Sequence, residues 1–245
     1  MSPRGQQAMS FGVPPVTPGV KWLGIATLVL SIGSVLGRTG EAMGSLFVFV
    51  PAKLAHLELW RLFTYSFLDP QPLNLLFSLL GLWLIGASLE ERWGTRRFVM
   101  FYFVTSALAA LATFAVGLVA PSVMGFPYAG NWAALEAMIA AMAVLMPDAT
   151  FFLYIVPVQA RWMLPISGGI TLLYMIMEGW QPYLPQLFGL GAGVLLAGRL
   201  SPGHFWLRAR VWWIDRRLRR SNLRVVRGVG GDEKRPVRGS DKYLH

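Results

Sequence analysis

The stretch LELWRLFTYSFLDPQPLNLLFSLLGLWLIGASLEERWGTRRF, residues 57–98, decides the fold class. Its start, with Trp60 and Arg61, is typical of a loop at a membrane interface, where amphipathic side chains have one wet and one apolar end. An apolar run follows over residues 72–89 and ends abruptly in charged residues. We therefore expect an interfacial loop followed by a membrane helix.

Polar side chains within this helix predict that it belongs to a bundle. Asn74 and Ser78 lie four residues apart, so they share one face of the helix. A polar face is unfavourable against lipid and needs partners on other helices. The rest of the chain must supply these partners.

The composition of the whole chain agrees with a membrane protein. Of its 245 residues, 55% are apolar and only 14% are charged, whereas a soluble domain carries about 25% charged residues. The chain has no Cys, which excludes disulfides and a thiol nucleophile. We expect an all-α membrane protein with one main domain, and neither a cofactor nor a metal site.

Apolar runs predict six membrane spans, which together form a membrane domain over residues 21–200. The expected spans are residues 22–37, 72–89, 98–120, 131–146, 162–177 and 183–198. Residues 38–71 and 147–161 are expected to be loops. A cleaved signal peptide is the alternative interpretation of the first run.

The distribution of basic residues predicts the orientation. If the N-terminus lies inside, 19 of the 22 Lys and Arg residues fall in inner segments, as the positive-inside rule requires. The short loops alone favour this orientation only slightly. We expect a multi-pass protein of a plasma membrane or bacterial-type inner membrane, with both termini cytoplasmic. Asn74, Trp132 and Gln186 would then lie at similar depth.

Small residues indicate a close pair of helices. Gly189 and Gly193 form a GxxxG face on the sixth span, which lets another helix backbone approach closely. The fourth span begins near Gly130 and continues with Ala133 and Ala137. This pattern is equally compatible with simple packing.

These motifs resemble the rhomboid family of intramembrane serine proteases. The resemblance extends over about residues 20–200 and includes six spans in the same order. The matching positions are Trp60 and Arg61 in the first loop, Gly86, Glu90, Arg92 and Gly94 near the end of the second span, Gly130 before the fourth, and Gly189 and Gly193 in the sixth. The resemblance implies a six-helix rhomboid-like bundle.

The catalytic positions depart from the rhomboid pattern. Trp132 stands where the resemblance expects the nucleophilic Ser, and Gln186 stands where it expects the base His. Asn74 and Ser78 occupy the positions of the oxyanion His and Asn, and Asp69 replaces an earlier His. Neither an indole nor a carboxamide can act as nucleophile or base near pH 7. We therefore expect a catalytically incomplete, pseudoprotease-like member with no catalytic residue.

The altered site suggests a polar pocket in place of a catalytic one. Its expected members are Asn74, Ser78, Asn131, Trp132, Glu136 and Gln186. Glu136 costs about 2.5–3.5 kcal/mol in a membrane helix, which makes it a functional candidate. Alternatively, Glu136 ties helices together through Asn74, Ser78, Asn131 or Gln186. We expect Trp132 to fill the former active-site cavity and its indole N–H to bond Gln186 or Glu136.

The two ends of the chain have other compositions. Residues 1–20 predict a flexible leader, and residues 228–245 a disordered tail. Residues 201–227 interleave Arg with Trp and Phe, which predicts a basic amphipathic segment on anionic lipid. Nucleic acid is the disfavoured alternative, because this segment directly follows the last span.

The function expected from these features is binding of transmembrane segments of client or partner proteins. A site without a nucleophile can keep the recognition that the rhomboid resemblance implies and still not cleave. The alternatives are an active intramembrane serine endopeptidase, as the family alone implies, with Ser122 as the nearby serine, and a membrane scaffold.

Overall fold

The computed structural model describes residues 14–153 and 156–200. The chain divides into two units, residues 1–204 and 205–245. All of the described residues belong to the first unit. The second unit lies outside them, as do the basic segment predicted for residues 201–227 and the tail predicted after it.

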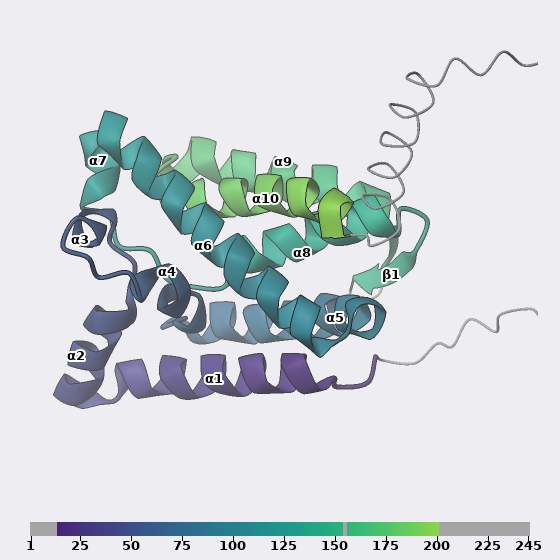
Figure 1. Cartoon of the computed structure of the whole chain (residues 1–245), viewed down its shortest axis with the longest axis horizontal. Helices are drawn as coiled ribbons and strands as arrows, with labels where there is room; N and C mark the ends of the chain where they lie inside the picture. The colour runs from purple at the N-terminus through teal and green to yellow at the C-terminus, as the bar shows by residue number, and fades with distance from the viewer. Residues whose placement is uncertain (1–13, 154–155, 201–245) are drawn as a thin grey trace, which may run out of the picture. The chain divides into compact units, whose positions relative to one another are not determined.

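The first unit is a bundle of apolar helices that run back and forth between two ends (Figure 1). Its long helices are α1 (Pro18–Val35), α5 (Pro72–Trp93), α6 (Thr95–Val119), α8 (Trp132–Leu145), α9 (Ala160–Glu178) and α10 (Leu184–Leu200). Helix α1 begins and α10 ends at the same end of the bundle (Figure 1). Helices α5, α8 and α10 run in one direction, and α1, α6 and α9 run in the other.

Four of these helices are long and apolar enough to cross a membrane: α1, α5, α6 and α9. Helices α8 and α10 are apolar but shorter. The chain is therefore a mainly helical, multi-pass membrane protein. The predicted run of residues 72–89 corresponds to α5, which extends four residues further. Helix α1 begins at Pro18, so the last residues of the expected leader are helical.

Two segments expected to be loops contain regular structure. Residues 38–71 were predicted to lack it, but they include α2 (Gly37–Phe47), α3 (Pro51–Leu54), α4 (Arg61–Thr64) and η1 (Tyr65–Phe67). In the second, β1 (Thr150–Leu153) pairs with β2 (Val156–Gln159) as an antiparallel hairpin. The expectation that residues 147–161 form only a loop was therefore wrong, because β-branched and aromatic residues in this segment favour strands. The fold class remains that of a mainly helical membrane protein.

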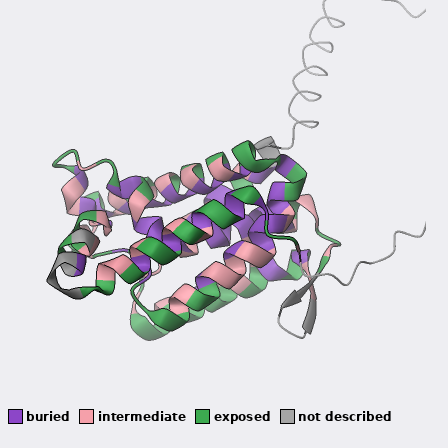
Figure 2. Ribbon diagram, turned by 90° about the horizontal axis from the view of Figure 1, so that it is seen from below, coloured by how far each residue is buried: buried purple, intermediate pink, exposed green. Residues whose placement is uncertain are grey.

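Helix α8 lies at the centre of the bundle. It packs against α5, α6, α9 and α10, and most of its residues are buried, whereas the surrounding helices expose their outer faces (Figure 2). Exposed apolar side chains on the outer helices suit contact with lipid. The centre of the bundle is therefore where a site shielded from lipid can form.

Glu90 joins the starts and ends of three helices. Its carboxylate accepts hydrogen bonds from the backbone N–H groups of Gly19 and Val20, at 2.8 and 2.9 Å, and from the hydroxyls of Thr17 and Thr95, both at 2.6 Å. Two donors that α1 cannot satisfy internally are thus paired with a negative charge at its positive end.

Gly94 makes the turn between α5 and α6. Its φ of +79° lies in the left-handed region that favours glycine, and its N–H bonds the carbonyl of Glu90 at 2.7 Å. The glycine of the sequence motif thus ends α5 beside the carboxylate that holds α1.

Candidate functional site

The backbones of α8 and α10 are in direct contact. A Cβ added at Gly189 would lie 2.1 Å from the carbonyl oxygen of Ala133, and one at Gly193 would lie 2.3 Å from that of Ala137. These distances are far below any real Cβ contact, so only glycine fits. The structure therefore places the GxxxG face of α10 against the small residues of α8.

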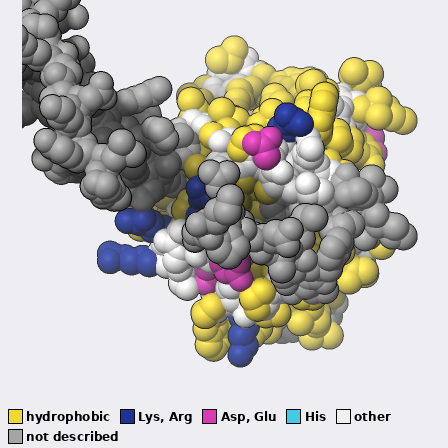
Figure 3. Space-filling view, turned by 90° about the vertical axis from the view of Figure 1, so that its right-hand side faces the viewer, with side chains coloured by type: hydrophobic (Ala, Val, Ile, Leu, Met, Phe, Trp, Pro, Cys, Tyr) yellow, Lys and Arg dark blue, Asp and Glu magenta, His cyan; other side chains and the backbone are white. Residues whose placement is uncertain are grey.

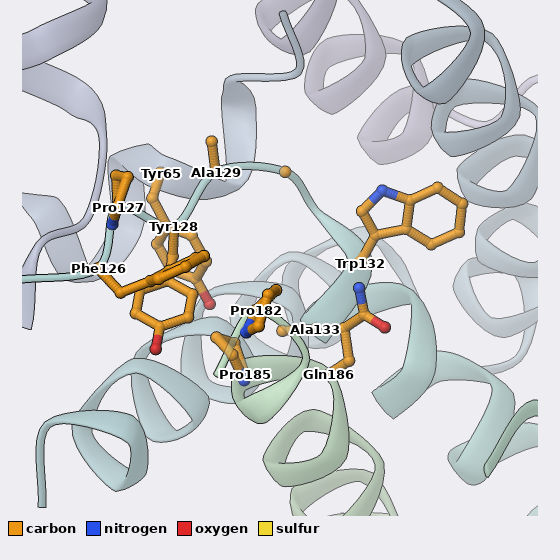
Figure 4. A pocket seen from close by; sticks show the side chains of 11 residues that line it. Tyr65, Phe126, Pro127, Tyr128, Ala129, Trp132, Ala133, Pro182, Pro185 and Gln186 are labelled. Carbon is orange, nitrogen blue, oxygen red and sulfur yellow. The ribbon is translucent and has the colours of Figure 1, made fainter. Parts of the chain in front are cut away.

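This contact brings to one pocket the two residues that the rhomboid resemblance places at catalytic positions. Trp132 at the start of α8 and Gln186 in the first turn of α10 both line a cavity of about 160 Å³. In Figure 4, these two side chains lie at one side of the pocket, the aromatic residues Tyr65, Phe126 and Tyr128 lie at the other, and Pro182 and Pro185 lie between them. None of the lining residues is charged.

Trp132 lines the cavity but does not fill it. Its ring points away from the aromatic side of the pocket (Figure 4). Within the described residues, no hydrogen bond joins its indole N–H to Gln186 or Glu136. The expectation of a plug held by such a bond was therefore wrong, because Glu136 faces another helix.

The segment before α8 is fixed from two directions. The N–H of Gly130 bonds the carbonyl of Tyr65 at 3.0 Å, and Tyr128 pairs with Phe49 as an antiparallel bridge. Gly130 has a φ of +104°, which a residue with a side chain would rarely adopt. The glycine motif thus lets the chain turn into α8 beside the pocket.

The first loop is held by the two residues of its motif. Arg61 has only 1% of its surface exposed and donates to the Glu58 carboxylate at 2.5 Å, and to the carbonyls of Ser45 and Val48 at 2.7 and 2.5 Å. The indole N–H of Trp60 bonds the carbonyl of Leu46 at 3.2 Å. These bonds fold α2 and α4 together and have a structural role.

The six residues expected to form one polar pocket do not all come together. Trp132 and Gln186 line the cavity. Asn74 bonds the Gln71 side chain at 2.7 Å, and its side chain is partly exposed. Ser78 and Asn131 are fully buried. The sixth residue, Glu136, has partners on α9.

Glu136 ties α8 to α9. Its carboxylate accepts hydrogen bonds from the hydroxyls of Ser167 and, at 3.2 Å, Thr171. The expectation that Glu136 bonds Asn74, Ser78, Asn131 or Gln186 was wrong, because its carboxylate faces α9. Ser167 and Thr171 lie four residues apart and share a helix face, a signal by which the sequence could have revealed them.

Asp69 is a buried acid that the sequence motif marked only as a replacement. It is 5% exposed, and its Oδ2 atom has no hydrogen-bond partner among the described residues. Burial raises the pKa of Asp69 to about 6. Hydrogen bonds from the Gln71 backbone and the Ser78 hydroxyl lower the pKa, but their effect is smaller than that of burial. Both polar atoms of the Asn131 side chain are likewise buried without a partner in the described structure.

The described residues that line the pocket include no histidine. The chain has three His residues, of which His56 is exposed in the loop between α3 and α4, and the other two lie outside the described residues. Burial raises the pKa of Tyr128 to about 12, so its hydroxyl stays protonated and neutral. Within the described residues, no group of three or more His, Cys, Asp or Glu side chains is placed to hold a metal ion.

Three features define a rhomboid-like membrane protein. Helices surround a short central helix, a GxxxG face contacts that helix, and motif residues hold the first loop in place. The comparison with family models gives the particular family. The chain belongs to the family described as eukaryotic integral membrane protein (DUF1751), whose model matches residues 21–195. This match spans nearly all of the helical bundle and, together with two curated relatives, confirms the rhomboid-like resemblance.

These relatives carry rhomboid names. Rhomboid-like protein 19 of Arabidopsis thaliana is 26% identical over 180 residues, which cover 69% of this chain and 57% of that protein. Rhomboid-like protease 3 of Toxoplasma gondii is 30% identical over 145 residues, which cover 53% of this chain and 55% of that protein. The chain thus spans little more than half the length of these relatives. Both relatives are eukaryotic, so they give no support to a bacterial-type inner membrane. That localisation stays a prediction.

Proposed function

We propose that this protein binds transmembrane segments of client proteins without cleaving them. The observation that carries the proposal is the shared pocket of Trp132 and Gln186. The rhomboid resemblance places these residues at the positions of the nucleophile and base, and they lie together at the start of α8 and α10. The site therefore keeps a rhomboid-like arrangement but holds no Ser–His pair.

The proposed topology has six crossings, with both termini cytoplasmic. In addition to the four long helices, α8 and α10 cross as shorter ones. The 14 residues of α8 span about 21 Å, compared with about 30 Å for the hydrocarbon core. The pocket at the start of α8 then lies below the membrane surface, where a transmembrane segment can reach it.

The size of the pocket suits one side chain of a client. A cavity of about 150 Å³ takes a benzene ring, and this pocket measures about 160 Å³. Aromatic and proline walls favour an apolar side chain. Tyr128 adds a buried, neutral hydroxyl without a partner among the described residues, and the Gln186 carboxamide adds a second neutral polar group.

Photocrosslinking from the pocket tests this proposal. A photoreactive phenylalanine replaces Ala129, which lines the pocket, and the protein is reconstituted in liposomes with a single-span substrate of an active rhomboid. The control is the same probe at Ile176, which is 82% exposed on the outer face of α9. We expect an adduct from position 129 and little from position 176.

Three outcomes would contradict the proposal. Equal adducts from both positions would show random collision in the bilayer, and no adduct from position 129 would exclude binding of this substrate class at the pocket. Cleavage of the substrate would favour the alternative of an active endopeptidase, and Ser122 would then be replaced first.

A further inference from the structure

A second cavity opens on the lipid-facing side of the bundle, between α1 and α5. This groove has a volume of about 270 Å³. Its walls are Val16, Val20, Lys21, Gly24, Ile25 and Leu28 from the α1 side, and Leu79, Leu82 and Trp83 from α5. Lys21 is the one charged residue among the described residues that line it.

The groove follows a straight stripe along α1. Val20, Gly24 and Leu28 are spaced four residues apart, so they lie on one face of the helix, and the stripe between them is about 12 Å long. Gly24 forms the floor. The nearest atom to a Cβ added there is Leu79 Cδ2, at an ordinary contact distance of 3.8 Å. The missing side chain thus leaves space between the two helices.

One wall of the groove is held in place. The indole N–H of Trp83 donates to the carbonyl of Pro14 at 3.1 Å, so the ring is fixed beside the groove. The bond also positions the residues that precede α1, so this wall of the groove is preorganised.

A positive charge stands at one end of the groove. Lys21 lies in the first turn of α1, is exposed, and has no ion pair within the described part of the chain. The nearby carboxylate of Glu90 is already occupied by four hydrogen bonds. Figure 3 looks at this end of the bundle, where Lys, Arg, Asp and Glu side chains emerge among hydrophobic ones.

We propose that this groove is a binding site for one anionic phospholipid, whose acyl chain lies along Gly24 and whose phosphate pairs with Lys21. Helices α1 and α5 are both long enough to span a membrane, so the groove faces lipid. Lipid tails are as apolar as the groove, so close packing and the headgroup charge provide the affinity. A lysine at headgroup depth favours an anionic lipid.

Native mass spectrometry of the delipidated full-length protein tests the site. The probes are palmitoyl-oleoyl phosphatidylglycerol and the corresponding phosphatidylcholine, titrated in the same detergent. Gly24→Leu fills the groove, and Gly33→Leu is its matched control on the same helix, because a Cβ at Gly33 has no atom within 4 Å. Lys21→Gln removes the headgroup partner, and Lys53→Gln on α3 is the charge control.

The wild type is expected to keep one phosphatidylglycerol at energies that remove detergent. Gly24→Leu weakens this binding at least tenfold and Gly33→Leu leaves it unchanged. Lys21→Gln lowers the preference for phosphatidylglycerol over phosphatidylcholine about fivefold, and this arm stands even if Gly24→Leu fails to fold. Equal titrations of wild type and Lys21→Gln would overturn the proposal. So would a dimer that Gly24→Leu converts to monomer, because the groove would then hold a second copy.

Discussion

The close contact between α8 and α10 predicts that Gly189→Ala is strongly destabilising. The added Cβ would lie 2.1 Å from the carbonyl oxygen of Ala133, and a backbone atom cannot move aside as a flexible side chain can. The two helices must therefore separate by about 1 Å, and a gap of 0.5–1 Å already forfeits a quarter to a half of each dispersion contact. Overpacked sites cost about 1–3 kcal/mol, and we expect the upper end.

The matched control is Gly191→Ala on the same helix. A Cβ at Gly191 has no atom within 4 Å, so alanine there gains helix propensity, by up to about 1 kcal/mol, without a clash. Thermal unfolding of the purified protein in detergent is the assay. We expect Gly189→Ala to lower the melting temperature clearly and Gly191→Ala to leave it unchanged or raise it. Equal melting temperatures for the two variants would refute the contact.

Three further predictions concern the acidic residues. Glu90→Ala is expected to cost about 3 kcal/mol of stability, because it leaves donors at the start of α1 unpaired, whereas the exposed Glu91 tolerates alanine within about 0.5 kcal/mol; equal losses in chemical denaturation would contradict this. The raised pKa of Asp69, about 6 compared with 3.8, means that its contribution to stability is fully present below pH 3.8 and is lost as the pH rises through 6. Allowing for solvent access to the carboxyl, the loss of stability is about 2 kcal/mol. The melting temperature of the wild type should therefore fall between pH 4.5 and 7.5, and that of Asp69→Asn should lose this pH dependence. An unchanged pH dependence in the variant would show that another group titrates. Glu136→Leu is expected to cost less than about 1 kcal/mol, because helix hydroxyls such as that of Ser167 can bond their own backbone; a loss above about 2 kcal/mol would show that the carboxyl is required for folding.

The sequence predicted the long helices well because their signals are local. The apolar run from residue 72 marks the start of α5 and Gly94 marks its end, whereas the charged residues that follow Leu89 lie within the helix. The glycine motif of α10 and the alanines of α8 likewise indicated a close helix pair. Each of these inferences needs only the periodicity and the residue size.

The first loop and the hairpin were harder to predict. Helix α2 contains three glycines, Gly37, Gly40 and Gly44, and glycine disfavours a helix. Its position depends on the bonds of Arg61 to carbonyls 13 and 16 residues earlier, which no local pattern reveals. In the hairpin, Pro157 weakened the strand signal.

The polar site required helix rotations that spacing alone does not fix. Trp132 and Glu136 lie four residues apart, which suggested a shared pocket, yet one lines the cavity and the other bonds α9. Which neighbour each side chain meets depends on how α9 and α10 are arranged around α8. The sequence therefore identified candidate residues but could not assign their partners.

The central claim is that the pocket binds transmembrane segments and does not cleave them. The most direct test incubates the purified protein in liposomes with a single-span substrate, beside an active rhomboid protease. Our account predicts full-length substrate after prolonged incubation, while the active protease yields cleaved product. Cleavage that a serine-directed phosphonate abolishes would contradict the account.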